Sequence, residues 1–273
     1  MNEPIAPGLA LRDLAASELD AAIAGLAWRG GRLHAGVHQA RKSLRRARAI
    51  LALGTPVLGR GGVLVDRELR RVNRGLSSLR DAQALVETLD RLIARHPETE
   101  ITPQLRRARR IAAAQRAPRM RAALQADPGL AATRALLVAM RAASLSLPWA
   151  ALTPLHWQDA LAASAGRCIK ARVQVHTTGS DADWHHWRRR LRRLSQQQRA
   201  CKLAGLGFIV PSLFDKSMTE QLGAAQDLNL LIEHCRRDSP FARDDRRALR
   251  RYADTALARQ RKRILAADQA AAG

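Results

Sequence analysis

The sequence has few aromatic residues, few cysteines and no long hydrophobic run. Aromatic residues make up 3% of its 273 positions, which argues against a protein that binds unpaired bases by stacking. No stretch approaches ~18 consecutive apolar residues, so we expect no transmembrane helix. Residues 1–22 carry acids and lack a basic segment followed by a long apolar one, so we expect no signal peptide and a cytoplasmic location.

Cysteine is too scarce and too dispersed for a disulfide framework or a zinc site. The three cysteines, Cys168, Cys201 and Cys235, form no C-x-x-C pair, and we expect them to be reduced and buried. His34 and His38 have a spacing that suits metal chelation, but no third ligand is evident and the neighbouring cations would repel a divalent ion. We therefore expect no metal site.

Catalytic signatures are also missing. The sequence contains no phosphate-binding G-x-x-x-x-G-K-[ST] loop, no G-x-S-x-G segment and no H-E-x-x-H segment. A histidine within an arginine cluster could in principle accept a phosphoryl group, but this alternative has little support. We expect a protein that is not an enzyme and needs no cofactor.

Negative charge is scarce as well. Only 24 acidic residues oppose 47 Lys and Arg, which leaves a formal charge of +23 and a pI near 11.7, and five of the 47 cations are lysine. Because 47% of the residues are apolar, the composition is that of a folded protein rather than a disordered basic tail. Such a positive field favours an anionic partner such as nucleic acid, an acidic membrane or a polymeric phosphate.

The sequence pattern is helical nearly throughout. Ala, Leu and Arg dominate, Gly and Pro cluster at a few breaks, and no alternating strand pattern is present. The pattern predicts an all-α fold. The expected helices cover 15–29, 32–54, 63–95, 102–126, 129–147, 156–175, 181–204, 212–237 and 241–267.

Two basic segments repeat each other. Residues 37–49 and 184–196 align without gaps, and His38 then matches His185 at an offset of 147 residues. Residues 78–89 and 224–235 align at an offset of 146. Two segments with nearly one offset indicate an internal duplication of about four helices per half.

Two copies favour two helical bundles over a solenoid. We expect the first bundle at 1–150 and the second at 151–273, with a basic groove or pore between or along them. The join is expected near 148–154, where prolines interrupt the helical pattern.

Each repeated helix has one apolar stripe and one strip of cations around a histidine. Neither 37–49 nor 184–196 contains an acid, whereas an ordinary solvated helix face interleaves both signs. Arginine suits phosphate because its planar guanidinium donates in pairs. An exposed basic face in an arginine-rich protein is the simpler alternative, but the duplication favours an anion site. The candidate contacts are His38, Arg41, Lys42, Arg45, Arg46 and Arg48 in the first copy and His185, Arg188, Arg189, Arg192 and Arg193 in the second.

Two aspartates lie at equivalent positions downstream of the basic helices. Asp81 and Asp227 each neighbour apolar residues on an expected helix. They could orient an arginine or histidine of the basic helix, or be ordinary acids on a helix surface. The sequence supports both interpretations equally.

The doubled H-x-x-R-x-x-[LIV]-[RK]-[RK] helix, each followed by an Asp-containing helix, resembles the CHAD domain, a histidine-containing α-helical domain. The resemblance covers about 15–267. It implies two four-helix bundles related by pseudo-two-fold symmetry, with basic helices lining a shared groove or pore. It also implies binding of inorganic polyphosphate and association with polyphosphate granules. The contact residues that it implies are His38, Arg41, Arg45, Arg46, His185, Arg188, Arg192 and Arg193.

Some features depart from the family pattern. Ser195 and Gln196 stand where the family tends to keep Arg and Tyr, and Gln226 stands where the first half has Arg80. The β-barrel triphosphatase-like domain often fused to such domains, with its E-x-E-x-K motif, has no counterpart here, so the chain resembles a stand-alone member.

Nucleic acid is the rival partner. The charge and pI satisfy the first criterion for a nucleic-acid-binding protein, and phosphate contacts alone would give nonspecific, salt-sensitive affinity. Against it, the sequence shows no helix-turn-helix, zinc finger or RNP-like segment. Polyphosphate has no bases, so a groove lined by Arg and His is sufficient to bind it.

Overall fold

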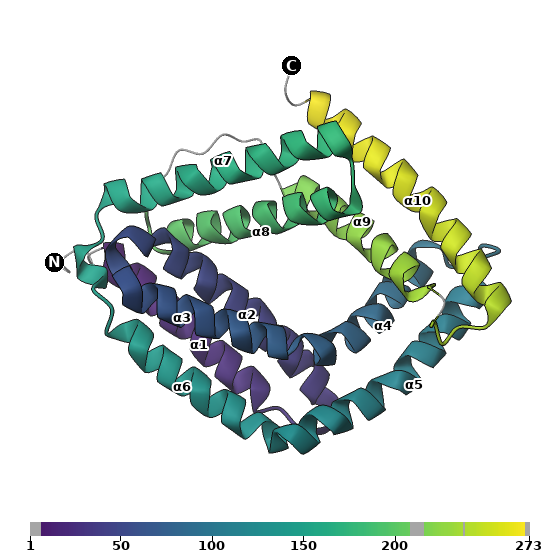
Figure 1. Ribbon diagram of the computed structural model, residues 1–273, viewed down its shortest axis with the longest axis horizontal. Helices are drawn as coiled ribbons and strands as arrows, with labels where there is room; N and C mark the ends of the chain where they lie inside the picture. Colours follow the sequence, from purple (N-terminus) through teal and green to yellow (C-terminus); the bar gives the residue numbers. More distant parts are fainter. Residues whose placement is uncertain (1–6, 208–215, 237, 271–273) are drawn as a thin grey trace. The chain divides into compact units, whose positions relative to one another are not determined.

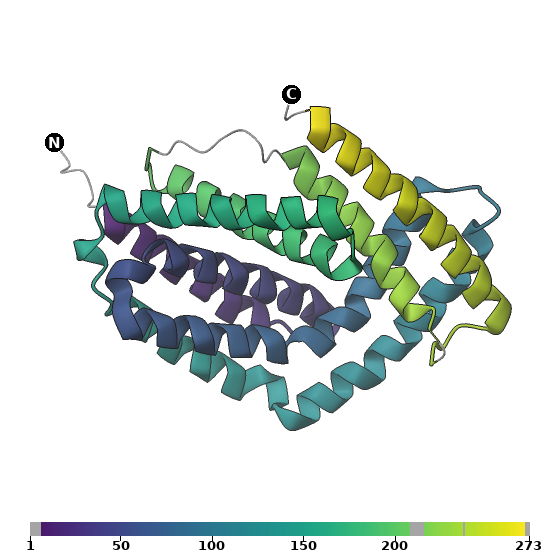
Figure 2. The ribbon, with the colours of Figure 1, turned by 45° about the horizontal axis from the view of Figure 1, so that its top comes forward.

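The computed structural model describes residues 7–207, 216–236 and 238–270, and these residues form helices without any strand. The chain is therefore all-α, as the sequence predicts. Figures 1 and 2 show the ten α-helices of the described residues. They are α1 (Pro7–Leu26), α2 (Leu33–Leu53), α3 (Thr55–Gly75), α4 (Ser77–Arg95), α5 (Thr102–Ala126), α6 (Ala131–Leu145), α7 (Pro154–Thr178), α8 (Asp181–Leu203), α9 (Lys216–His234) and α10 (Arg243–Ala270).

The expected helices 32–54, 102–126 and 181–204 match α2, α5 and α8 within one residue. The expected helix 63–95 is instead two helices, α3 and α4, separated at Leu76, whose φ of −78° and ψ of 1° depart from the helical value. Helix α3 also begins earlier than expected, at Thr55, and bends at Gly59, whose φ of +57° suits glycine. The expected helix 212–237 includes residues 212–215 and 237, which lie outside the described residues.

The chain divides into two compact units that are interleaved along the sequence. Unit 1 comprises Met1–Ser77 and Leu124–Pro211, and unit 2 comprises Ser78–Ala123 and Ser212–Gly273. This division differs from the successive bundles 1–150 and 151–273 that we expect from the repeat. The reason is that both basic helices, α2 and α8, pack against each other within unit 1. The internal duplication itself stays a prediction.

Helix α2 lies against α1 at very short range. A Cβ atom added at Gly36 would lie 2.1 Å from the backbone oxygen of Gly25 on α1. A Cβ added at Gly25 would lie 2.8 Å from the oxygen of Gly36. Two facing glycines thus allow the backbones of α1 and α2 to approach, and this contact fixes the position of α2.

The apolar stripes expected on the two basic helices are buried. On α2 the stripe comprises Val37, Ala40, Leu44, Ala47 and Leu51, and on α8 it comprises Trp184, Trp187, Leu191 and Leu194. Burial of these faces supplies the main stabilisation of both helices. Helix α7 runs alongside α8 and contacts it (Figures 1 and 2). The cationic sides of α2 and α8 are consequently turned away from the apolar core.

In unit 2, helices α4, α5, α9 and α10 are joined by ion pairs. Asp227 of α9 accepts two hydrogen bonds from Arg91 of α4, each 2.8 Å long, and a third from Thr88 at 3.2 Å. Arg107 of α5 pairs with Asp245 of α10 at 2.8 Å. Asp227 thus orients an arginine, but one outside the repeated basic helices. The side chain of Asp81 lies outside the described residues.

The three cysteines are buried, as expected, and none of them forms a disulfide in the described part of the chain. Burial raises the pKa of the Cys168 thiol to about 12 and the pKa values of the Cys201 and Cys235 thiols to about 11. Thiols of this kind are poor nucleophiles at neutral pH. Among the described residues, none of the helices has the length and hydropathy needed to cross a membrane.

Candidate polyanion site

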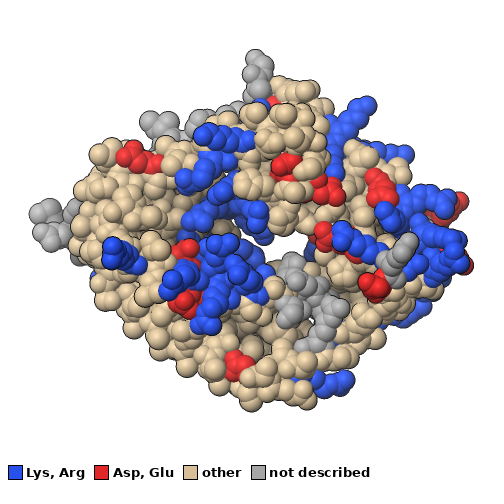
Figure 3. Space-filling view, viewed as in Figure 1, with Lys and Arg blue, Asp and Glu red and all other residues tan. Residues whose placement is uncertain are grey.

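Helices α2, α3 and α8 of unit 1 line an open cavity of about 470 Å³, which we call the basic cavity. Its lining contains seven arginines and one histidine, and none of its lining residues carries a carboxylate. Figure 3 shows Lys and Arg side chains gathered over α3 and the neighbouring part of α8. The basic cavity is lined by Arg45, Arg48, Ala49, Arg70, His186, Arg189, Arg190, Arg192, Arg193 and Gln196.

Five residues singled out from the sequence line this cavity, and they come from both repeated helices. Because α2 and α8 are in contact, the cationic strips of the two repeats meet at one site. This is the arrangement that binding of one shared anion requires. The five are Arg45, Arg48, Arg189, Arg192 and Arg193.

The other six predicted contacts are not among the cavity-lining residues. Arg46 pairs with Glu18 of α1 at 3.2 Å, and Arg41 donates a hydrogen bond to the backbone carbonyl of Asn73 on α3. These two arginines therefore fasten α2 to its neighbours. Their contact with a polyanion stays a prediction, as it does for Lys42, His38, His185 and Arg188.

Three of the lining residues that are arginine or histidine were not among the contacts predicted from the sequence. Arg70 belongs to α3, and His186 and Arg190 are four residues apart on α8, so they share one side of that helix. The repeat alignment pairs His38 with His185, yet the imidazole that borders the cavity is that of His186, while His185 is exposed. Residues 186, 189, 190 and 193 have the spacing of one helix face. This spacing could have identified the lining residues of α8 without the repeat alignment.

Positive charge in the cavity is only partly balanced. Arg48 makes a two-pronged pair with Asp66 of α3 at 2.9 and 3.1 Å. The pKa of Arg193 is lowered by burial and by repulsion from Arg48, Arg167 and Arg190, against an opposing attraction to Asp66. The Nε of Arg193 is buried and has no hydrogen-bond partner among the described residues. An anion in the cavity would relieve both the repulsion and the missing hydrogen bond.

The surroundings of His186 disfavour its protonated form. Its Nε2 accepts a hydrogen bond of 3.2 Å from the Nε of Arg190. Burial lowers the pKa of His186, and the charges of Arg190 and Arg189 lower it further, with a smaller opposing effect from Asp183. Because these cations disfavour the imidazolium, a bound anion would raise this pKa.

The donor set of the cavity suits anions rather than cations. Guanidinium groups donate hydrogen bonds and accept none. Among the described residues, no group of three or more His, Cys, Asp or Glu side chains could hold a metal ion. Chemically, the cavity is a set of fixed hydrogen-bond donors with positive charge.

Comparisons with known proteins agree with this architecture. The family model of the CHAD domain matches residues 13–206. PptA from Streptomyces chartreusis has a similar structure, with a TM-score of 0.68, 19% sequence identity, and coverage of 96% of this chain and 99% of that chain. The CHAD domain from the plant Ricinus communis has a TM-score of 0.70 and 17% identity, with coverage of 99% and 93%. None of the curated protein sequences matches this chain.

Proposed function

The chain belongs to the CHAD domain family, and we propose that its basic cavity binds inorganic polyphosphate. The observation that carries the proposal is the lining itself, in which seven arginines from α2, α3 and α8 surround a space without a lining carboxylate. Seven like charges at one site repel each other, so a polyanion that replaces water there gains their combined attraction. The family resemblance found in the sequence implies the same ligand.

Arginine geometry favours phosphate groups in a row. The cavity-lining residues of α8 extend from His186 to Gln196, about 15 Å along the helix at ~1.5 Å per residue. Arginines of α2 and α3 face the same cavity, so successive phosphates would receive hydrogen bonds from more than one helix. A linear chain of phosphates matches such an elongated set of donors.

The proposal involves binding without a chemical step. Phosphoryl transfer usually needs carboxylates that hold Mg²⁺ and a group that positions the nucleophile. The lining of the basic cavity offers Arg, His, Gln and Ala side chains instead. We therefore assign the site a role in holding phosphate chains.

Polyphosphate is a better match than nucleic acid because the aromatic side chains of α8 are unavailable for stacking. Trp184 and Trp187 are 6% and 1% exposed, respectively, and both belong to the apolar core. Without stacking platforms, nucleic acid would bind through its phosphates alone. A polyphosphate chain has no sugars or bases to accommodate, so each of its units can accept hydrogen bonds from the arginines of the cavity.

A competition experiment tests this function. Fluorescently labelled polyphosphate bound to the whole chain is displaced by unlabelled polyphosphate, single-stranded DNA, double-stranded DNA or RNA, at matched phosphate concentration and fixed salt. We expect polyphosphate to compete at least ten times better than any nucleic acid. Equal or better competition by a nucleic acid would overturn the proposal in favour of a nucleic-acid-binding function.

We further propose that polyphosphate binding recruits the protein to polyphosphate granules in the cytoplasm. A fluorescent fusion of the whole chain should colocalise with stained granules. The Arg45→Ala/Arg193→Ala variant of the fusion should become diffuse. Granule localisation that survives in this variant would separate targeting from the basic cavity.

A further inference from the structure

Unit 2 contains a second cavity, of about 790 Å³, which we call the mixed cavity. Its size is within the range of small-molecule sites, about 300–1,000 Å³. It lies between the α4–α5 connection and helices α9 and α10. It is lined by Leu92, Arg95, His96, Glu100, Ile101, Gln104, Ala224, Leu228, Ala248, Arg251, Tyr252, Thr255, Ala256, Arg259, Gln260 and Arg263.

Two adjacent rows of side chains on α10 line one side of the mixed cavity. Arg251, Thr255, Arg259 and Arg263 form one row with a spacing of four residues, and Ala248, Tyr252, Ala256 and Gln260 form the other. Residues spaced by four lie on one side of a helix. Buried Leu92 and Leu228 lie opposite and supply an apolar surface. The mixed cavity therefore combines an apolar floor with a charged rim, unlike the basic cavity.

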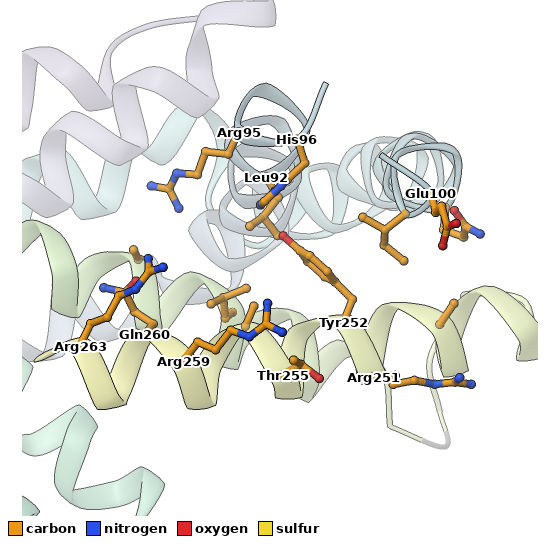
Figure 4. Close-up of a pocket in the computed structure, with 16 residues that line it drawn as sticks. Leu92, Arg95, His96, Glu100, Arg251, Tyr252, Thr255, Arg259, Gln260 and Arg263 are labelled. Atoms are coloured by element: carbon orange, nitrogen blue, oxygen red, sulfur yellow. The ribbon is translucent and has the colours of Figure 1, made fainter. Parts of the chain in front are cut away.

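The two ends of the mixed cavity differ. Figure 4 shows Arg95, Arg259 and Arg263 toward one end, Glu100 and Arg251 toward the other, and the ring of Tyr252 between them. None of these four arginines has an ion-pair partner among the described residues. One end is thus a cluster of three cations from α4 and α10, suited to a phosphate or a similar anion.

The middle of the cavity offers an aromatic surface with an unsatisfied polar group. His96 and Tyr252 meet edge to face, with ring centroids 5.6 Å apart and an interplanar angle of 85°. The hydroxyl of Tyr252 is buried and has no hydrogen-bond partner among the described residues. Burial raises the pKa of Tyr252, with an opposing effect from Arg95, so this hydroxyl is neutral and able to donate. A buried hydroxyl without a partner is costly, and a ligand with a polar ring atom would satisfy it.

From this geometry we propose that the mixed cavity binds a nucleotide, that is, a heteroaromatic ring that carries phosphate groups. The ring packs on the apolar floor beside Tyr252, whose hydroxyl and the amide of Gln260 supply hydrogen bonds to ring atoms. The phosphates reach Arg95, Arg259 and Arg263. The site is separate from the basic cavity in its residues, its unit and its ligand, so each of the two proposals can fail without the other.

The composition of the chain provides a selective reporter for this site. Tyr252 is the sole tyrosine, so the whole chain made with 3-fluorotyrosine has one ¹⁹F resonance, and it originates from the mixed cavity. We use ATP as the probe, with adenosine and inorganic triphosphate as its two separated parts. The background is Arg45→Ala/Arg193→Ala, which removes two arginines of the basic cavity.

We expect ATP to shift the ¹⁹F signal saturably, and adenosine and triphosphate to bind at least ten times more weakly. Arg259→Gln/Arg263→Gln should weaken ATP at least ten-fold, whereas Arg243→Gln/Arg247→Gln, an exposed pair elsewhere on α10, should not. Ala256→Phe should place a ring inside the cavity beside Tyr252 and abolish the ATP shift, while Ala258→Phe on the exposed side of α10 should leave it unchanged.

Three results would overturn the nucleotide site: no ATP-dependent shift, an equal affinity for triphosphate, or an ATP shift that survives Ala256→Phe. Circular dichroism of each variant establishes that its helix content is preserved. Polyphosphate affinity of the otherwise unsubstituted Ala256→Phe chain is measured in parallel. We expect this affinity to be unchanged, since Ala256 has no part in the basic cavity.

Discussion

The arginines that join the helices of unit 2 and the arginines that line the basic cavity of unit 1 are in opposite environments. In unit 2, Arg91, Arg107 and Arg109 each face an aspartate on another helix and connect α4, α5, α9 and α10 in pairs. In unit 1, the arginines of the basic cavity converge on a space that no carboxylate lines. Arginine thus joins helices at Arg91, Arg107 and Arg109, whereas the arginines of the basic cavity gather positive charge at one site, the feature on which the proposed anion binding rests.

This difference shows that net charge alone does not locate function. The formal charge of +23 belongs to the whole chain, but only part of it is concentrated at sites without compensating acids. The direction of the pKa shift distinguishes an arginine that pairs with an aspartate from an arginine of the basic cavity. The pKa of Arg91 is raised, chiefly by its hydrogen bonds to Asp227, whereas that of Arg193 is lowered, chiefly by burial. Four predictions test how far the two units really differ.

The largest effect is expected from removal of charge inside the basic cavity. Arg45→Ala/Arg193→Ala should weaken polyphosphate binding by about 100-fold at low salt, and should reduce the slope of log affinity against log salt by about two, one per lost phosphate contact. Fluorescence anisotropy over a salt series measures both quantities.

The matched control for this variant is Arg106→Ala/Arg110→Ala, which removes two exposed arginines of α5 in unit 2. It has the same change in net charge. It should weaken binding less than three-fold and leave the salt slope nearly unchanged. Equal losses in the two double variants would mean that polyphosphate responds to net charge and not to the basic cavity.

A second large effect, on the free energy of unfolding, is expected from a substitution at the contact between α1 and α2. Gly36→Ala places a Cβ 2.1 Å from the oxygen of Gly25, so the helices must separate, at a cost of about 2 kcal/mol. Gly166→Ala in α7 is the control, because a Cβ there meets nothing within 4 Å. That variant should be neutral or stabilising by up to about 1 kcal/mol.

Urea unfolding resolved by unit measures this effect. All five tryptophans lie in unit 1 and the single tyrosine lies in unit 2. Tryptophan fluorescence should report the loss of stability in Gly36→Ala. The ¹⁹F signal of fluorotyrosine shows whether unit 2 unfolds with it. A Gly36→Ala protein as stable as the parent would refute the close approach of α1 and α2.

A smaller effect is expected from pH. In the free protein the pKa of His186 lies below its usual value, and a bound polyanion would raise it. Binding is then coupled to proton uptake, so the affinity should be highest at acidic pH and should fall as the pH rises through the pKa of the bound state. The change should not exceed about ten-fold per pH unit, because one proton is involved.

The polyphosphate affinity of the His186→Gln variant is measured from pH 5 to pH 8. Comparison with the unsubstituted protein separates the contribution of His186 from the protonation of polyphosphate itself. The variant should lose part of the pH dependence. His185→Gln, at the exposed neighbouring position, should retain it. A parental pH profile in His186→Gln would exclude His186 as the proton acceptor.

The smallest effect is expected from the cross-links of unit 2. Asp227→Asn removes the charge that Arg91 and Thr88 share, and because Arg91 is 43% exposed the loss should be only about 1 kcal/mol. Asp254→Asn, whose more distant pair with Arg250 is exposed, should cost less. Thermal unfolding measures both variants. Polyphosphate affinity should be unaffected in each, and a marked loss of binding in Asp227→Asn would contradict the division of roles between the units.

Local sequence was sufficient for α2 and α8, two of the three helices that line the basic cavity. The stripes of α2 and α8 follow from helical periodicity, since burial of Leu44 and Leu191 requires the arginines beside them to lie on the other side. Helical periodicity does not show which part of the polar side of α8 faces a neighbouring helix, and so which residues line the cavity. His185 and His186 both lie on the polar side, and tertiary packing makes His186 the lining residue.

Two other features depended on tertiary structure. The periodic pattern continues through Leu76, so the separation of α3 from α4 had only Gly75 and Ser77 as local signals; Ser77 donates a hydrogen bond to the carbonyl of Arg74. The grouping of segments into interleaved units depends on long-range contacts such as that of α2 with α8. A comparison of repeats aligns equivalent helices, but it carries no information about which copies pack together.

The reactivity of the buried thiols reports how often the helices around them separate in each unit. Cys168 and Cys201 belong to unit 1 and Cys235 belongs to unit 2, and their high pKa values suppress the thiolate that alkylating reagents need. Each thiol should therefore react only when its surrounding helices separate. Mass-spectrometric mapping of alkylated cysteines over time would give an opening rate for each unit in the unsubstituted protein.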